Sequence, residues 1–162
     1  MDWRTFLTIG HIIGTVLGVG GATFAEIFIQ KSLKDGKIEP TENQFLHTTY
    51  FVLRVGLVIL VLSGIGYYIL AVQTGTTARF LSPRILAKMT ITAIIVLNAI
   101  LLKVKKVPLW LGSGISLTSW YAALVIGAWR VKADYLTLIF WYIVGIGLVT
   151  LTLKQIATWT RK

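Results

Sequence analysis

The residues of this sequence that could do chemistry are few, and they lie within or beside stretches of apolar side chains. They are His11, Glu26, His47, Arg54, Lys88 and the neutral but polar Asn98. An ionisable group inside a membrane costs roughly 2.5 to 3.5 kcal/mol on insertion scales, so each is a candidate for a partner or a function. Imidazoles ligate metals, carboxylates pair with cations, and several such groups together can form a polar path through a membrane.

The elements that must position these residues are long apolar segments. The chain has 162 residues, of which 56% are hydrophobic and 14% charged, whereas soluble domains average about 25% charged residues. A helix needs about 20 apolar residues to cross ~30 Å of hydrocarbon. The apolar stretches therefore predict an all-α integral membrane bundle of five transmembrane helices in a single domain, residues 1–162. The expected helices cover about residues 5–29, 46–72, 84–102, 109–129 and 135–153.

Several classes of protein are excluded by composition and by missing motifs. The chain has no cysteine, so it forms no disulfide or iron–sulfur cluster and has no thiol chemistry. Its net charge of +10 lies mainly in the connections between apolar segments, which argues against a nucleic-acid partner. There is no G-x-S-x-G motif, no P-loop and no dinucleotide fingerprint. Whether the protein is an enzyme stays open.

The distribution of lysine and arginine predicts the orientation in the membrane. Basic residues are more numerous in the connections that share a side with the carboxyl terminus. By the positive-inside rule we expect a multi-pass protein of the cell membrane with its N-terminus outside and its C-terminus in the cytoplasm.

Depth along the helices sorts the polar residues into two layers. The outer layer holds His11 and Lys88, the inner layer holds Glu26, His47 and Asn98, and Arg54 lies between them. His11 and Glu26 are separated by ~15 residues of helix, about 22 Å, which is too far for one site. We expect Glu26 to lie beside His47 or Arg54, because a buried carboxylate costs less when it is paired with a cation.

The two histidines cannot ligate the same iron. His11 and His47 enter from opposite ends of adjacent antiparallel helices and should differ in depth by roughly 20 Å. A heme held by one protein histidine remains open, with His11 as the iron ligand. A zinc site is not indicated, because zinc usually takes three or four protein ligands and the chain has no HxxxH or HxxE cluster.

Small residues recur at every fourth position of the first apolar segment. They are Gly10, Gly14, Gly18 and Ala22. This small-xxx-small pattern lets two helices approach closely in lipid. It predicts a helix contact within the chain, or a homo-oligomer or partner helix bound through Gly10, Gly14 and Gly18. Alternatively, Gly14 and Gly18 make room for a flat cofactor or a narrow pathway.

Three features together carry a family resemblance: a histidine in a small-residue first helix, the stretch "FVLRVGLVILVLSGIGYYIL" and the stretch "PRILAKMTITAIIVLNAILL". Over roughly residues 6–102 the chain resembles CopD-like and HemJ-like small membrane proteins and related uncharacterised bacterial integral membrane proteins. The HemJ-like group are protoporphyrinogen oxidases that bind heme b, and a first-helix histidine and a third-helix lysine are functional in them. The resemblance implies heme b between the first three helices, with His11 on the iron and Lys88 as a charge for a propionate or as a partner on the second side of the heme. Asn98 stands where a further histidine would be expected.

Three functions follow for a protein surrounded by the lipid bilayer. The first is binding of heme or a porphyrin. The second is a small permease or channel for an ion or small solute, with a polar path through Glu26, His47, Arg54 and Lys88. The third is a membrane-complex subunit whose glycine stripe binds a partner helix.

Overall fold

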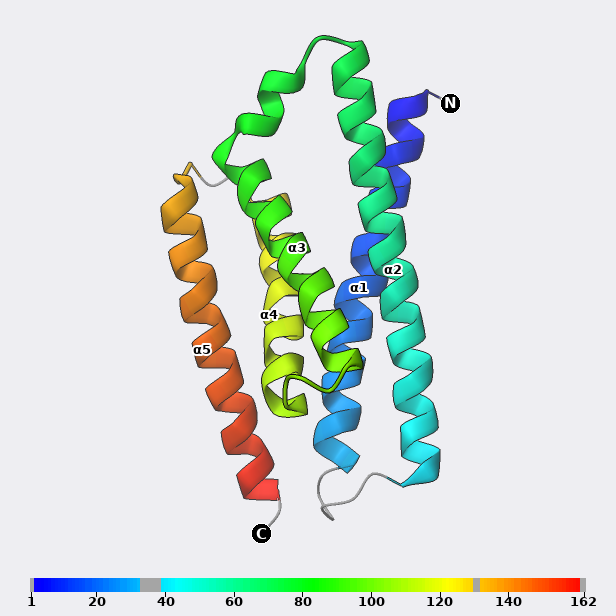
Figure 1. Cartoon of the computed structure of the whole chain (residues 1–162), viewed down its shortest axis with the longest axis vertical. Helices are drawn as coiled ribbons and strands as arrows, with labels where there is room; N and C mark the ends of the chain where they lie inside the picture. Colours follow the sequence, from blue (N-terminus) through cyan, green and yellow to red (C-terminus); the bar gives the residue numbers. More distant parts are fainter. Residues whose placement is uncertain (1, 33–38, 130–131, 161–162) are drawn as a thin grey trace.

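Five long helices and one short 3-10 helix make up the computed structural model, which describes residues 2–32, 39–129 and 132–160 (Figure 1). The helices are α1 (Trp3–Ser32), α2 (Pro40–Gln73), η1 (Thr77–Leu81), α3 (Pro83–Lys103), α4 (Leu109–Ala128) and α5 (Tyr135–Thr160). The described residues contain no strand, and each of the five long helices is long and apolar enough to cross a membrane. The predicted all-α bundle of five membrane-spanning helices is confirmed.

Two helices extend well beyond their apolar stretches. Helix α2 begins at Pro40 because a capping box supports its start: Glu39 N–H donates to Glu42 Oε2 at 3.0 Å, and the Glu39 side chain accepts in return from the Glu42 backbone. Helix α5 continues past Lys154 to Thr160. A charge ends an apolar run but does not break a helix, so helices extend beyond the stretches that predict them.

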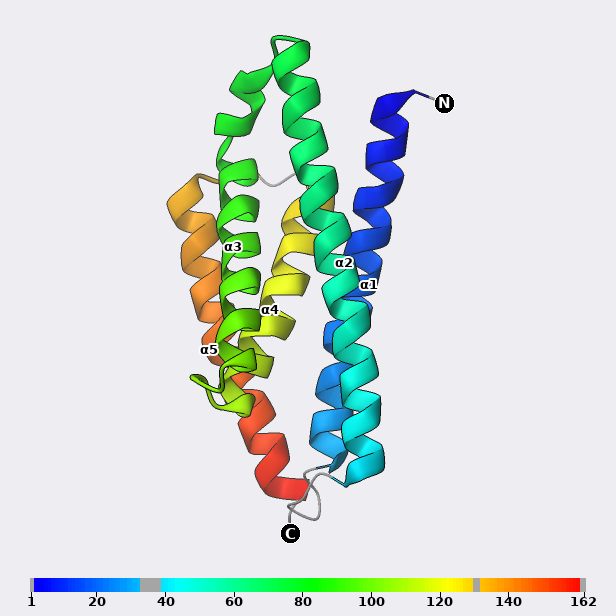
Figure 2. The same cartoon turned by 45° about the vertical axis from the view of Figure 1, so that its right-hand side comes forward.

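Helices α1 and α2 form an antiparallel pair in direct backbone contact. A Cβ atom on Gly14 would lie 2.8 Å from Leu60 N and 2.9 Å from Gly56 O, and one on Gly56 would lie 2.9 Å from Gly18 N. Only glycine permits this approach. The two helices lie side by side in Figures 1 and 2. The predicted helix contact through the glycine stripe is therefore made within the chain, and Gly14 and Gly18 are buried there.

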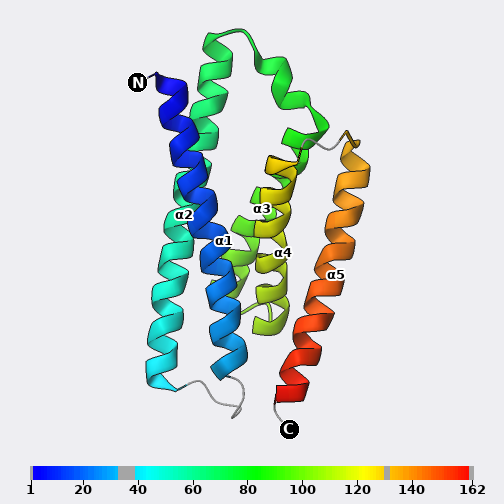
Figure 3. The ribbon, with the colours of Figure 1, turned by 180° about the vertical axis from the view of Figure 1, so that it is seen from behind.

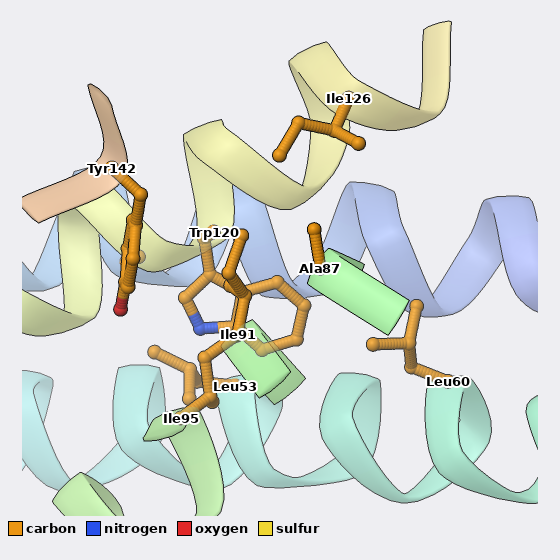
Figure 4. Close-up of a cluster of buried hydrophobic side chains, with 9 residues drawn as sticks. Leu53, Leu60, Ala87, Ile91, Ile95, Trp120, Ile126 and Tyr142 are labelled. Atoms are coloured by element: carbon orange, nitrogen blue, oxygen red, sulfur yellow. The ribbon is translucent and has the colours of Figure 1, made fainter. Parts of the chain in front are cut away.

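Helix α4 joins the α1–α2 pair to the rest of the bundle. It packs on α1, α3 and α5, and its Trp120 is 1% exposed. In Figure 4 the Trp120 indole lies at the centre of the apolar cluster, close to Ile91. Helix α5 packs on α4 and α3 and lies at the opposite edge of the bundle from α2 (Figures 1 and 3). The N-terminus and the C-terminus lie at opposite ends of the bundle (Figure 1).

Candidate functional site

A group of hydrogen-bonded side chains joins α1 to α2 at the end of the bundle that carries the N-terminus. We call it the N-side cluster; it comprises Thr8, His11, Ser63 and Tyr67. His11 Nδ1 lies 2.9 Å from Ser63 Oγ, and the Ser63 hydroxyl donates to the Leu60 carbonyl at 2.9 Å. Because a serine hydroxyl has one hydrogen, His11 Nδ1–H is the donor in the first bond. This assignment, which follows from the hydrogen-bond network, leaves the free lone pair of a neutral His11 on Nε2.

Tyr67 completes the N-side cluster. Its ring lies edge-on to His11, with the centroids 5.9 Å apart. The Tyr67 hydroxyl lies 2.6 Å from Thr8 Oγ1, and Thr8 in turn donates to the Arg4 carbonyl at 2.8 Å. Each of these hydroxyl groups therefore has a partner, and the chain of bonds ends on backbone carbonyls.

Two cations of α3 lie next to this cluster. Lys88 is half-buried and close enough to His11 for their charges to interact. Arg84, one turn earlier on α3, interacts with Lys88 in the same way. The structure thus brings His11 and Lys88 together at one end of the bundle, where the depth estimate had placed them.

The space beside Gly14 and Gly18 does not fit a porphyrin. A Cβ atom on Gly18 would overlap the indole of Trp120, and Gly14 lies against the backbone of α2. Both glycines are therefore covered by protein atoms, and a ring placed there would have to displace a helix. Within the described residues, no group of three or more His, Cys, Asp or Glu side chains is arranged to hold a metal ion.

The expected pairing of Glu26 with His47 or Arg54 is not formed. Glu26 is buried, whereas both cations are exposed, and no ion pair joins them in the described part of the chain. His47 and Arg54 each follow a buried leucine, Leu46 and Leu53 respectively. One residue of helix turns a side chain by about 100°, so both cations point away from the face that packs on α1.

Glu26 instead belongs to a second group, at the end of the bundle that carries the C-terminus. We call it the C-side cluster; it comprises Glu26, Gln30, Tyr50, Ser113 and Ser116. Gln30 Nε2 donates to Glu26 Oε1 at 2.6 Å and to the Leu153 carbonyl of α5 at 3.3 Å. Glu26 Oε2 and Gln30 Oε1 are both buried without a hydrogen-bond partner. Two acceptor oxygens in this cluster therefore lack donors.

Glu26 lines a small cavity between α1, α2, α3 and α4. The cavity has a volume of about 20 Å³, and its polar lining comes from Glu26, Tyr50, Ser113 and Ser116. A cavity of roughly 10–15 Å³ or more can hold one water molecule. The cavity can therefore hold a species of about that size.

A larger pocket lies beside this cavity, towards the ends of α1 and α5. Its volume is about 190 Å³, and it shares Ile29 and Ser113 with the small cavity. Gln30, Trp110 and Lys154 also line it, and Lys154 Nζ lies over the Trp110 ring, 5.2 Å from its centroid. The Gln30–Glu26 hydrogen bond connects the lining of the pocket to the lining of the cavity.

Asn98 lies near the C-side end of α3, in the inner layer where depth places it, and it joins two helices. Its Nδ2 donates to the Gly112 carbonyl at 2.8 Å, which ties α3 to α4, and its Oδ1 is buried without a partner.

Sequence reasoning overlooked Gln30, whose signal is its i, i+4 spacing from Glu26. It also overlooked Ser113 and Ser116, which lie one helical turn apart in a glycine- and serine-rich part of α4.

The predicted residues thus divide between two sites and the surface. His11 and Lys88 lie at the N-side end, Glu26 lines the C-side cavity, and His47 and Arg54 lie on the exposed face of α2. No family model matches this chain, and no curated protein and no solved structure matches it either.

Proposed function

We propose that this multi-pass membrane protein is a small permease that moves a proton or a small monovalent cation, with Glu26 as the binding group. One observation carries the proposal: the carboxyl group of Glu26 is buried, lines a water-sized cavity and has an oxygen with no hydrogen-bond partner. A buried carboxylate without a donor or cation is costly. Such residues within membrane-spanning helices commonly mark ion pathways.

The chemistry of the cavity favours a positive species. Glu26 Oε2, in the lining of the cavity, and Gln30 Oε1, in the lining of the neighbouring pocket, are acceptors without donors among the described residues. Water, a hydronium ion or a hard cation would satisfy them, because hard cations take carboxylate, amide and hydroxyl oxygens as ligands. An anion would meet the same oxygens and be repelled. The volume of about 20 Å³ argues against a larger solute.

The neighbouring pocket supplies a route of approach. It lies at the C-terminal end, which the proposed orientation places in the cytoplasm. Beyond Glu26, towards the N-side cluster, Trp120 covers Gly18 and the α1–α2 backbones touch. Transport therefore requires this packed middle of the bundle to open, which makes a carrier a better description than an open channel.

The two other functions have less support. Heme binding is supported by the lone pair of His11 Nε2, but the space beside Gly14 and Gly18 is filled by protein. Heme can be titrated into the purified protein while the Soret absorption is recorded. A Soret band in the native protein that is absent in His11→Ala would support heme binding. A subunit function would need another binding face, because Gly14 and Gly18 are covered within the chain.

Reconstituted liposomes test the permease. Vesicles holding a pH-sensitive dye, or a sodium-sensitive dye in a parallel set, are given a valinomycin-imposed potential, negative inside. We expect the native protein to admit protons or sodium faster than empty vesicles do. Glu26→Gln should fall to the rate of empty vesicles, because it removes the charge but keeps the size of the side chain.

Glu39→Gln is the matched control. It makes the same chemical change at an exposed position before α2, so it should transport like the native protein. Native vesicles that move neither ion would reject the permease, as would a Glu26→Gln protein that transports at the native rate.

A further inference from the structure

The start of α3 carries two cations that no carboxylate of the described residues neutralises. Arg84 and Lys88 lie one helical turn apart, so they share a face, and their charges interact. Arg84 Nε is buried without a hydrogen-bond acceptor. His11 of α1 is a third basic neighbour of Lys88, but its Nδ1 is engaged by Ser63. Three basic side chains thus lie together at the start of α3.

Each acid of the described residues is either bonded to its own helix start or lies far from Arg84 and Lys88. Asp2 Oδ1 accepts from Thr5 N–H at 2.7 Å, and Asp134 Oδ1 accepts from Thr137 N–H at 3.1 Å. The other three, Glu26, Glu39 and Glu42, lie on α1 towards its C-terminal end or at the start of α2, at the far end of the bundle. Over the described ranges 2–32, 39–129 and 132–160, no carboxylate forms an ion pair with Arg84 or Lys88.

We propose that Arg84 and Lys88 bind a phosphate group at the N-terminal end of the bundle. A guanidinium presents two parallel N–H donors to phosphate oxygens, and a lysine ammonium adds a point charge. The amino-terminal end of α3 contributes the positive end of its helix dipole. The phosphate belongs either to the headgroup of an anionic lipid or to a soluble phosphate compound, because both present the same oxygens.

This site is independent of the proposed transport function. It uses residues of α3 at the N-terminal end, whereas Glu26 lies at the C-terminal end. Loss of phosphate binding and loss of ion flux are therefore separate results.

Thermal unfolding with two probes tests the site. Inorganic phosphate is titrated into the protein in a neutral detergent, and in parallel the protein is placed in phosphatidylcholine nanodiscs with or without phosphatidylglycerol. We expect at least one probe to raise the Tm of the native protein. Lys88→Met and Arg84→Gln should each weaken that response, with a roughly tenfold or greater loss of apparent affinity, since each removes a charge-assisted hydrogen bond.

The variants are chosen to remain folded. Lys88→Met keeps the length of the side chain and removes a charge from a membrane-spanning helix, so its Tm without either probe should equal or exceed that of the native protein. Arg79→Gln is the matched control, because Arg79 is an exposed arginine on η1 at the same end of the bundle. It should keep the native response.

The outcomes separate the two sources of phosphate. A response to phosphatidylglycerol alone assigns the lipid headgroup, and a response to inorganic phosphate assigns a soluble ligand. The proposal is overturned if the native protein responds to neither probe, or if Arg84→Gln and Lys88→Met both respond like Arg79→Gln. Should Lys88→Met fail to fold, Arg84→Gln decides by the same criterion.

Discussion

At the N-terminal end of the bundle, the hydroxyl groups of Ser63, Tyr67 and Thr8 form hydrogen-bond chains that end on backbone carbonyls. At the C-terminal end, by contrast, Glu26 and Gln30 each have an oxygen without a donor among the described residues. Completed networks hold helices in one arrangement. A buried acceptor without a donor in the protein is usually satisfied by a water molecule or an ion. The N-side cluster thus attaches α1 to α2, whereas the C-side cluster has two open acceptor oxygens, which is consistent with the ion binding that we propose.

The packed middle of the bundle keeps these two clusters apart, so the largest expected effect comes from disturbing it. Gly14→Leu should destabilise the protein by about 3 kcal/mol or more, because the new side chain would meet backbone atoms of α2 that cannot move aside. Thermal unfolding in detergent measures the loss. Gly20→Leu is the control on the same helix, since nothing lies within 4 Å of a Cβ atom there. Equal unfolding temperatures for the two variants would refute the backbone contact.

The half-buried Leu17, which lies near Gly56, gives a second reference for that contact. Leu17→Ala removes side-chain atoms without forcing the helices apart. Gly14→Leu should therefore lower the unfolding temperature more than Leu17→Ala does. The reverse order would mean that the helices adjust to the added side chain.

A smaller effect is expected from opening the N-side network. Ser63→Ala leaves His11 Nδ1–H without an acceptor, at a cost of about 1–2 kcal/mol in the free energy of unfolding. Ser113→Ala at the C-terminal end should cost less, because the Ser113 hydroxyl makes only a long bond of 3.3 Å within its own helix. Chemical denaturation of both variants in the same detergent compares them. A larger loss of stability in Ser113→Ala than in Ser63→Ala would mean that the C-side cluster, and not the N-side cluster, holds the helices together.

Glu26→Gln should change stability less than Ser63→Ala and in the opposite direction. The glutamine keeps an acceptor for Gln30 and removes a charge that has no cation beside it. We expect the free energy of unfolding to stay the same or to rise by less than about 1 kcal/mol. A clear loss of stability in the denaturation curve would mean that Glu26 is held by a partner in the folded protein.

The smallest effect concerns acid pH. Hydrogen bonds from Thr5 to Asp2 and from Thr137 to Asp134 hold the pKa of each carboxyl below its usual value of 3.8. A carboxyl whose pKa is lowered in the folded state adds stability above its unfolded pKa, and that stability is lost as the pH falls through the folded value. As the pH is lowered from 3.8, the Tm should therefore decrease by a small amount. In the double variant Asp2→Asn and Asp134→Asn this part of the pH dependence should disappear, and an unchanged Tm profile would contradict it.

The five helices and the glycine contact could be predicted because lipid leaves few alternatives. A backbone inside a bilayer must satisfy its own hydrogen bonds, and helices that approach closely need small residues. The positions of His47 and Arg54 could not be predicted in the same way. Depth follows from counting residues along α2, but the direction of a side chain requires knowing which face of the helix is inside. Because α2 is apolar on its lipid side as well as on its packed side, no periodic pattern marks that face.

The residue that contacts Gly18 could not be predicted from the sequence either. The spacing of Gly14 and Gly18 predicts a close neighbour, but nothing in it distinguishes the backbone of α2 from an indole of α4. Trp120 lies far along the chain from Gly18, and their contact depends on how the α1–α2 pair packs on α4. Gln30 and the two serines of the C-side cluster come together for the same reason.

The contact between Gly18 and Trp120 also has a mechanical consequence. Where α1 meets α2, the two backbones are in direct contact and leave no space for a side chain at Gly14. Where α1 meets α4, the Trp120 ring occupies the space that a side chain at residue 18 would fill. Because the ring fills this recess, α1 cannot slide along α4 unless Trp120 first leaves it, so the contact fixes the register of the two helices.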